Sequence, residues 1–267
     1  MLRLRVLTAA VLLLLLLAGM FLLPRGGWQV ALVIPLLVAG HEWSRLAAFS
    51  RTAEAVFLCA LLAGDAFIWM VSRPGPVHAE YAAVASHAVY AISAAFWLII
   101  APVWLWLRLP ARNKTALAAA GCVVLLPTWL ALAQLQTQPH RLLLLLAVVW
   151  IADTAAYFSG RALGRHKLAP AISPGKTWEG VGGAFAAVTV YAVVLHFARL
   201  PIDDLPFVMV AFLGMTAFSI VGDLFESWFK RSAGVKDSGV IFPGHGGMLD
   251  RIDGVVAALP LAALIFT

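Results

Sequence analysis

The sequence predicts an all-α, polytopic membrane protein with about nine transmembrane helices. Of its 267 residues, 63% are hydrophobic and only 12% are charged, whereas soluble domains are nearer half apolar and a quarter charged. Long apolar stretches recur along the chain, and one helical crossing needs roughly 20 such residues. Stretches such as VLLLLLLAGMFLL do not alternate in polarity as barrel strands do, so the spans are expected to be helices.

Nine apolar segments account for this prediction. Their approximate limits are 4–23, 28–48, 53–71, 80–107, 115–135, 141–160, 179–199, 205–229 and 249–267. Most connections are short, which makes neighbouring helices antiparallel. Two connections, 160–178 and 230–248, are long and rich in glycine, proline and charge, and loops of that length generally have a function. The first segment has a basic start like a signal peptide, but it is long and no A-x-A site closes it, so we expect it to be retained.

The distribution of positive charge predicts an orientation. If the N-terminus is cytoplasmic and the sides alternate, fifteen of the 19 lysine and arginine residues fall on the cytoplasmic side. The four on the other side are Arg25, Arg73, Arg141 and Arg199. Cytoplasmic loops carry the excess of positive charge, so this split supports nine spans and places both long loops in the cytoplasm. Loop bias also explains the net charge of +6, and we expect no nucleic-acid partner.

Five acidic residues in the apolar segments from 141 onward mark a candidate site, and all five fall in the cytoplasmic half. They are Asp153, Asp223, Glu226, Asp250 and Asp253. Ionisable residues in the bilayer are costly and mark functional sites. Asp223 and Glu226 share a helix face, as do Asp250 and Asp253, because each pair is three residues apart. Carboxylates gathered at one depth favour a hard divalent cation, above all magnesium. The alternative for any one acid is a simple ion pair with a nearby lysine or arginine.

The first long loop supplies positive charge. It reads GRALGRHKLAPAISPGKTWEG, and we expect SPGKTWEG to begin the next helix, with a serine or threonine cap and Pro174 in the first turn. Free amides at such a start, with Lys176 beside them, favour a phosphate, which makes Ser173 and Thr177 candidate contacts. The GKT triplet does not complete a P-loop, because Pro170 stands where that pattern requires glycine.

The second long loop combines cations with glycines. Its candidate functional residues are Lys230, Arg231, Lys236, Gly244, His245, Gly246 and Gly247. Glycine lets the backbone approach a ligand closely. Together the loops and the five acids predict one pocket at the cytoplasmic face of the membrane, with metal-binding carboxylates below phosphate-binding cations. Such a pocket suits phosphoryl or nucleotidyl transfer, and its position at the hydrocarbon edge implies a lipid substrate.

The stretch SWFKRSAGVKDSGVIFPGHGGMLDRID resembles the signature of the phosphatidate cytidylyltransferase (CDP-diacylglycerol synthase) family. The residues that carry the resemblance are Ser227, Lys230, Arg231, Lys236, Asp237, Gly239, Pro243, His245, Gly246, Gly247, Asp250, Arg251 and Asp253. Upstream, WIADTAAYFSGRALGRHKLAPAISPGKTWEG and VGDLFES also look like its bacterial members. The resemblance covers 141–267, the expected catalytic transmembrane region. Residues 1–140 match only as N-terminal transmembrane helices, a part that varies among members of this family.

The resemblance implies that CTP and phosphatidic acid give CDP-diacylglycerol and pyrophosphate, at the cytoplasmic face of a bacterial inner membrane. It also implies a homodimer and a magnesium requirement, with potassium as a candidate companion ion. The implied metal ligands are Asp223 and Asp250, and the further candidates are Glu226, Asp253 and Asp153. The lipid phosphate would be the nucleophile, so no side chain need attack. Candidate catalytic residues are Lys176, Lys230, Arg231, Lys236, His245 and Arg251. Candidate substrate contacts are Ser173, Lys176, Thr177, Ser227, Gly246 and Gly247. His245 would donate to a phosphate or act as a catalytic acid.

Three other classes fit the sequence less well. A CDP-alcohol phosphotransferase needs D-G-x-x-A-R, which is absent, and then a second aspartate spacing that Asp253 misses by one residue. An ion-coupled transporter tends to show interrupted helices and paired repeats, and neither is evident. A non-enzymatic scaffold gives no reason for five acids at one depth. The sequence therefore favours a membrane nucleotidyltransferase.

Overall fold

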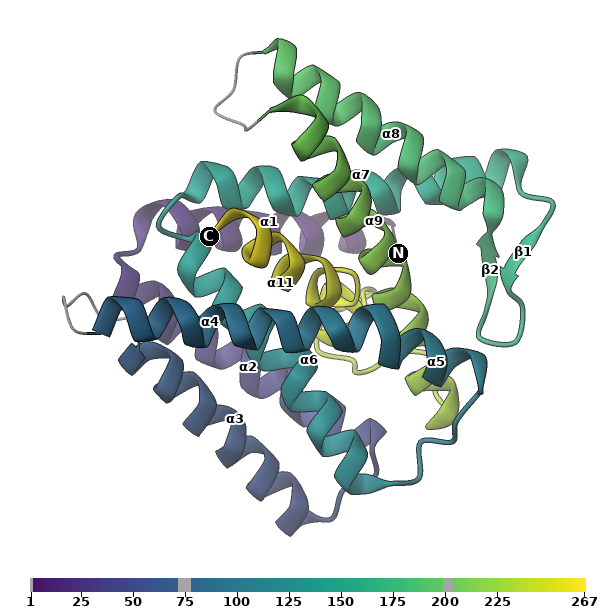
Figure 1. Cartoon of the computed structure of the whole chain (residues 1–267). Helices are drawn as coiled ribbons and strands as arrows, with labels where there is room; N and C mark the ends of the chain where they lie inside the picture. Colours follow the sequence, from purple (N-terminus) through teal and green to yellow (C-terminus); the bar gives the residue numbers. More distant parts are fainter. Residues whose placement is uncertain (1, 72–77, 199–203) are drawn as a thin grey trace.

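The chain folds almost entirely into helices, as predicted (Figure 1). The computed structural model describes residues 2–71, 78–198 and 204–267. The helices are α1 (Leu2–Leu22), α2 (Arg25–Leu46), α3 (Arg51–Val71), α4 (His78–Ala95), the π-helix η1 (Phe96–Ile100), α5 (Ala101–Trp106), α6 (Lys114–Leu135), α7 (Pro139–Leu163), α8 (Trp178–Phe197), α9 (Leu205–Ser232), α10 (Leu249–Ile252) and α11 (Val255–Phe266). The strands are β1 (Lys167–Ala169) and β2 (Ser173–Thr177).

Each predicted apolar segment coincides with helical structure. Within the described residues, six helical stretches are long and apolar enough to cross a membrane: Arg51–Met70, Ala83–Trp106, Lys114–Leu135, Pro139–Leu163, Trp178–Phe197 and Leu205–Ser232. Val6–Leu22 and Val255–Phe266 are apolar but shorter. The chain is thus a multi-pass membrane protein, while nine crossings and a cytoplasmic N-terminus stay predictions. Arg73 and Arg199, used in the charge comparison, lie outside the described residues.

The last segment differs from its prediction as one helix over 249–267. Helix α10 ends at Ile252, and α11 begins only at Val255. At 1.5 Å per residue, the 12 residues of α11 span about 18 Å, less than a hydrocarbon core of about 30 Å. Helix α11 lies at the centre of the molecule (Figure 1) and packs against α9, α6, α4 and α7. Its apolar side chains therefore pack against neighbouring helices. The turn between α10 and α11 places Asp253 where it lines a cavity.

A short hairpin corrects the predicted start of the eighth helical segment. Residues Ser173–Thr177 form β2, which pairs antiparallel with β1, so Pro174 lies in a strand and not in a first helical turn. Helix α8 begins at Trp178, and the Thr177 hydroxyl caps it by accepting a hydrogen bond from the Gly180 amide at 3.1 Å. The strand is favoured because β1 supplies backbone partners that a helix start would leave unpaired.

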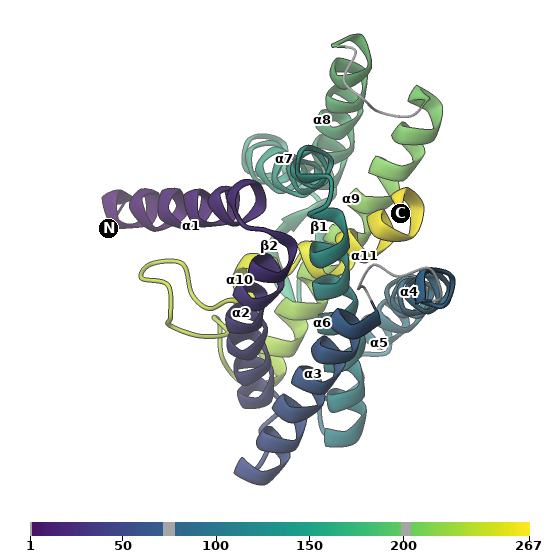
Figure 2. The same cartoon turned by 90° about the vertical axis from the view of Figure 1, so that its left-hand side faces the viewer.

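The second long loop, residues 233–248, folds back beside the first helix. Figure 2 shows this loop and α1 extending from the same side of the molecule. Gly234, Gly244 and Gly246 have positive φ angles of 75°, 75° and 78°, which side chains with a Cβ disfavour. The Phe242 amide donates to the Gly246 carbonyl at 3.0 Å and closes a tight turn there. These turns direct the chain from the end of α9 back to α10.

Candidate active site

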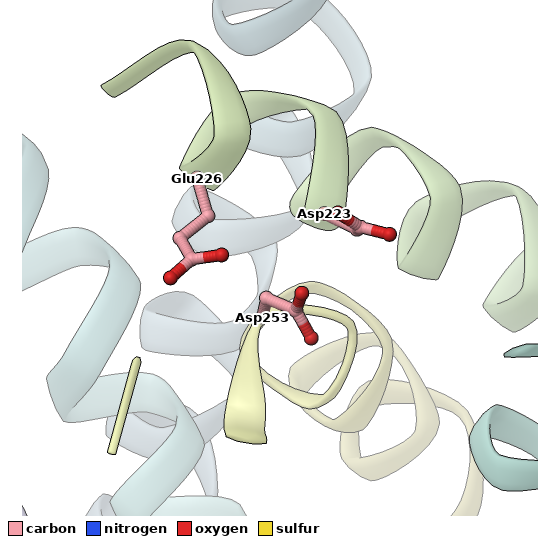
Figure 3. Close-up of side chains that lie close together, drawn as sticks. All are labelled: Asp223, Glu226 and Asp253. Carbon is pink, nitrogen blue, oxygen red and sulfur yellow. The ribbon is translucent and has the colours of Figure 1, made fainter. Parts of the chain in front are cut away.

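Helix α9 and the turn after α10 bring three carboxylates together. Asp223 and Glu226 extend from one face of α9, and Asp253 faces them from the turn before α11 (Figure 3). One oxygen from each of the three lies within 4.8 Å of the others. Like charges at this spacing repel one another strongly in a partly buried site. The arrangement therefore favours a bound cation, as the spacing of these acids predicts.

Lys230 connects α9 to α10 through two carboxylates. Its Nζ lies 2.8 Å from Glu226 Oε2 and 2.5 Å from Asp250 Oδ1. All three side chains are largely buried, at 12%, 9% and 6% exposed for Lys230, Glu226 and Asp250. Buried charges of this kind persist only when paired and hydrogen-bonded. The two ion pairs hold the start of α10 against the C-terminal end of α9. The charge distribution predicts that this end of α9 lies on the cytoplasmic side.

Asp250 is held by backbone amides as well as by Lys230. Its Oδ2 accepts hydrogen bonds from the amides of Ser238 and Gly247, each at 2.8 Å. Burial acts to raise the pKa of Asp250, but the Gly247 amide, the Lys230 ammonium and the Ser238 amide outweigh it and hold the pKa below its usual range. Asp250 is therefore anionic and fixed in orientation in the short α10 helix, which precedes the apolar α11.

A cavity of about 660 Å³ opens beside these carboxylates. Its polar and charged lining residues are Asp153, Tyr157, Arg161, Ser173, Lys176, Thr177, Asp223, Asp250, Arg251 and Asp253. They come from α7, the β1–β2 hairpin, α9, α10 and the turn after α10, so residues from the beginning and from the end of the predicted catalytic region line one cavity. Lys176 Nζ lies 2.5 Å from Asp223 Oδ2, and this ion pair ties the hairpin to α9. We call this space the polar cavity.

A second cavity of about 590 Å³ adjoins the first. It shares four lining residues with the polar cavity: Asp153, Asp250, Arg251 and Asp253. Its remaining wall is mainly apolar and comes from α1, α2, α6, α7, the 233–248 loop, α10 and the start of α11. The apolar lining includes Ala9, Leu12, Leu13, Leu16, Leu32, Pro35, Trp129, Leu132, Leu146, Trp150, Phe242, Met248, Ile252 and Val255. We call this space the apolar cavity. The acids therefore stand at a boundary between a polar and an apolar compartment.

His245 and Arg251 are the polar groups on the loop side of the apolar cavity. His245 lines it, and its Nδ1 atom is buried without a hydrogen-bond partner among the described residues. Arg251 lines both cavities. Two nitrogen groups beside an apolar wall suit an anionic headgroup attached to hydrocarbon.

The alternative of plain ion pairs applies to only part of the acidic set. Asp223, Glu226 and Asp250 each pair with a lysine. Within the described part of the chain, no lysine or arginine lies within 4.0 Å of Asp153 or Asp253. Among the described residues, these two acids, which line both cavities, thus form no ion pair with a lysine or arginine.

Several predicted site residues lie away from the cavities or are engaged elsewhere. Arg231 and Lys236 are exposed and line neither cavity. Ser227 donates to Asp223 at 3.3 Å. Thr177 lines the polar cavity, but its hydroxyl caps α8. The Gly247 amide donates to Asp250.

Gly246 meets the site through its backbone geometry. Besides its positive φ, a Cβ at Gly246 would collide with the Asp250 carboxylate. The absence of a side chain at Gly246 therefore leaves room for the Asp250 carboxylate.

Glu42 is a site neighbour that the sequence analysis missed. It lies in α2, within the part expected to vary, and is 4% exposed. Its carboxylate accepts hydrogen bonds from Ser238, Met248 and Leu249. The sequence offered one signal, an acidic residue close to the end of an apolar segment. Because His41 and Arg45 lie beside it, Glu42 is hard to distinguish from the ordinary charge of a loop.

Comparisons with known proteins identify the family to which the chain is related. A family model described as "Cytidylyltransferase family" matches residues 3–267. Phosphatidate cytidylyltransferase of Haemophilus influenzae is 33% identical over 285 aligned residues, covering 100% of this chain and 99% of the relative. The Pseudomonas aeruginosa protein of the same name is 38% identical over 276 residues, covering 99% and 97%. The Brucella melitensis protein of that name is 43% identical over 195 residues, covering 64% and 70%.

These matches extend through α1 to α6 as well as through the region that carries the signature. The family model begins at residue 3, and two full-length relatives exceed 30% identity. The resemblance found in the second half of the sequence is therefore confirmed along the whole chain. The chain belongs to the cytidylyltransferase family of nucleotidyltransferases.

Proposed function

We propose that the chain is a phosphatidate cytidylyltransferase, which makes CDP-diacylglycerol and pyrophosphate from CTP and phosphatidic acid. The observation that carries this proposal is the contact between the two cavities. The polar cavity suits a triphosphate and the apolar cavity suits acyl chains, and Asp153, Asp250, Arg251 and Asp253 line both. The reacting phosphates would meet at that boundary. The charge distribution supports a site that faces the cytoplasm, and the similarity to bacterial proteins supports a bacterial inner membrane.

The carboxylates fit a hard divalent cation, for which we propose magnesium, with potassium as a candidate companion. Oxygens of Asp223, Glu226 and Asp253 lie within 4.8 Å of one another, and Glu226 Oε1 is buried without a hydrogen-bond partner among the described residues. Carboxylate oxygens are the ligands that such ions prefer. These three residues would hold the ion, which when bound neutralises phosphate charge.

The two further candidate ligands have different surroundings. Asp153 lines both cavities and would complete the acidic wall. Asp250, which the family resemblance implies as a ligand, has both oxygens engaged by Lys230 and by amides. A role for Asp250 as a metal ligand is supported by its position, because it lines both cavities. Asp250 also orients Lys230 and the segment from Ser238 to Asp250, which we call the 238–250 loop.

The polar cavity offers cations to the nucleotide. Lys176 and Arg161 line it from the hairpin and from α7, and Arg251 lines it from α10. Their positive charge would neutralise the triphosphate and then the leaving pyrophosphate, which is where charge builds up in this class of reaction. Ser173 lies on the same wall and would donate its hydroxyl.

The apolar cavity would accept the lipid. Leu12, Leu13 and Leu16 of α1 present hydrocarbon to acyl chains. His245 and Arg251 would bind the lipid phosphate at the polar end and hold it toward the nucleotide. An oxygen of that phosphate would form a bond to the α-phosphorus of CTP while the bond to the β-phosphate oxygen breaks. Pyrophosphate departs, and no side chain forms a covalent intermediate.

An assay of the purified protein in detergent tests this proposal. With labelled CTP, phosphatidic acid and magnesium, we expect a labelled lipid, and chelation by EDTA should stop its formation reversibly. Asp253→Asn should reduce turnover at least 100-fold, because it removes one charge from the carboxylate group that would hold the cation.

Asp204→Asn is the matched control. It makes the same chemical change at an exposed position at the other end of α9, and it should retain wild-type turnover. Absence of labelled lipid from folded wild-type protein would overturn the proposed activity. Wild-type turnover in Asp253→Asn would overturn the role of this carboxylate.

A further inference from the structure

Glu42 has a buried carboxyl group that forms no ion pair in the described part of the chain. Its Oε1 accepts a hydrogen bond from the Met248 amide at 2.9 Å. Its Oε2 accepts from the Leu249 amide at 2.9 Å and from the Ser238 hydroxyl at 2.8 Å. Three donors therefore replace the water that this carboxylate lost on burial.

The donors belong to the loop that carries the sequence signature. Ser238 lies before its turn, and Met248 and Leu249 lie at the start of α10. Amides at a helix start have no partner within the helix, and Glu42 supplies one from α2, more than 200 residues earlier in the chain. Asp250 follows directly after these anchored amides.

Ser238 transmits this anchoring to Asp250. Its amide donates to Asp250 Oδ2 at 2.8 Å, while its hydroxyl oxygen lies 2.8 Å from Glu42 and 3.0 Å from Asp250. One hydroxyl has one proton, so it can donate to only one of the two carboxylates at a time. Movement of Glu42 would therefore redirect the hydroxyl toward Asp250 and change the set of hydrogen bonds that orients the Asp250 carboxylate.

The glycines of the signature fit around Glu42 as well. A Cβ at Gly247 would collide with both Glu42 oxygens, and a Cβ at Gly239 would collide with Oε1. The room that these glycines leave is filled by the Glu42 carboxylate. Because neither glycine has a side chain, the loop backbone at Gly239 and at Gly247 can lie close to the Glu42 carboxylate.

We infer that Glu42 is a positioning residue for catalysis: it sets the 238–250 loop so that Asp250 and Arg251 face the two cavities. This inference rests on the proposed cytidylyltransferase activity. Glu42 itself lines neither cavity, so it acts through Ser238 and the α10 amides. Groups that orient active-site ligands in this way typically change activity or metal affinity about 10–100-fold when replaced.

Glu42→Gln tests the inference with little change in volume. The amide nitrogen would face a donor that the carboxylate now accepts from, so the loop should shift. We expect kcat to fall about 10–100-fold per folded molecule and the magnesium concentration for half-maximal rate to rise. We also expect faster hydrogen exchange at the Met248 and Leu249 amides in protein without substrate. A purely structural role would lower the unfolding midpoint and leave kcat of the folded fraction unchanged.

Two further variants sharpen the result. Glu54→Gln is the matched control, because the Glu54 carboxylate pairs with His41 and, among the described residues, forms no hydrogen bond or ion pair with the 238–250 loop. This variant should match wild type in kcat, metal dependence and exchange. Glu42→Asp retains the charge and should recover part of the lost kcat.

Each outcome decides between separate claims. Wild-type kcat and wild-type exchange in folded Glu42→Gln would overturn the positioning role while leaving the proposed activity intact. An inactive wild-type protein would overturn the proposed activity, and the exchange measurement would still report whether Glu42 holds the loop.

Discussion

Lys230 illustrates how one residue joins two parts of the site. It forms ion pairs with Glu226 on its own helix and with Asp250 on α10. The two carboxylates together exceed its single charge, so the group keeps a net negative charge next to Asp223 and Asp253. A lone lysine therefore holds the helices together without neutralising the acidic cluster.

Replacement of Lys230 by methionine should destabilise the fold. The side chain keeps its length but loses its charge, which leaves Glu226 and Asp250 buried without a cation. Removing one partner of a buried pair costs about 3–5 kcal/mol. We expect a lower midpoint for unfolding in detergent, measured by near-UV circular dichroism in EDTA.

The double variant Lys230→Met with Glu226→Gln is the control for this explanation. It removes one of the stranded charges, so it should recover part of the lost stability. If Lys230→Met alone unfolds at the wild-type midpoint, the ion pairs contribute little to the fold.

At the scale of elements, the junction between β2 and α8 depends on one side chain. Thr177 ends the strand, and its hydroxyl accepts the Gly180 amide at 3.1 Å as the N-cap of α8. The same residue packs beside Gly160 at the end of α7, where a larger residue would meet the Thr177 hydroxyl. The cap thus fixes the hairpin that carries Lys176 toward Asp223.

Thr177→Ala should remove this cap and lower the free energy of unfolding by about 1 kcal/mol. Thr177→Ser keeps the hydroxyl and should retain most of that stability. Chemical denaturation of the two variants in the same detergent provides the measurement. Equal stability of the alanine and serine variants would show that the hydroxyl is not needed as a cap.

Helix α11 shows how apolar composition can serve packing instead of a full crossing. Its residues from Val255 to Pro260 are all buried, enclosed by α4, α6, α7 and α9. At about 18 Å it is shorter than the hydrocarbon core. A short central helix lets its polar start, at Asp253 and Gly254, lie beside α9 within the body of the protein.

At the scale of the whole molecule, the predicted orientation places both long loops on one side. The polar cavity opens between elements that include the β1–β2 hairpin, and the 233–248 loop leads into α10. An orientation that separated these loops would divide the site between two sides of the membrane. The shared cavity therefore adds a structural reason to the charge argument.

Single-cysteine labelling tests this orientation. In a Cys59→Ser, Cys122→Ser background, cysteines at Lys167 and Asp237 should react with an impermeant maleimide only in inside-out vesicles. A cysteine at Gln138, in the connection between α6 and α7, should react only in right-side-out vesicles. All three positions are exposed. Labelling of Lys167→Cys and Asp237→Cys from opposite sides would contradict the predicted arrangement.

The sequence by itself determined the helical membrane class, the acidic residues and the family. Long apolar stretches predict helices because the bilayer leaves backbone groups no other partner. Asp223, Glu226 and Asp253 stood out because charges are costly at those positions. The dense motif from Ser227 to Asp253 was specific enough to indicate the cytidylyltransferase family before any contact was known.

Only the tertiary structure decided which groups those residues face. Local spacing placed Asp250 with Asp253, yet the Asp250 carboxylate accepts hydrogen bonds from the Lys230 ammonium and the Ser238 amide. Glu42 is separated from Met248 by more than 200 residues, a distance that no periodic pattern spans. Periodicity reports which face of a helix is apolar, whereas the partner of a buried carboxylate depends on how helices far apart in the chain pack against one another.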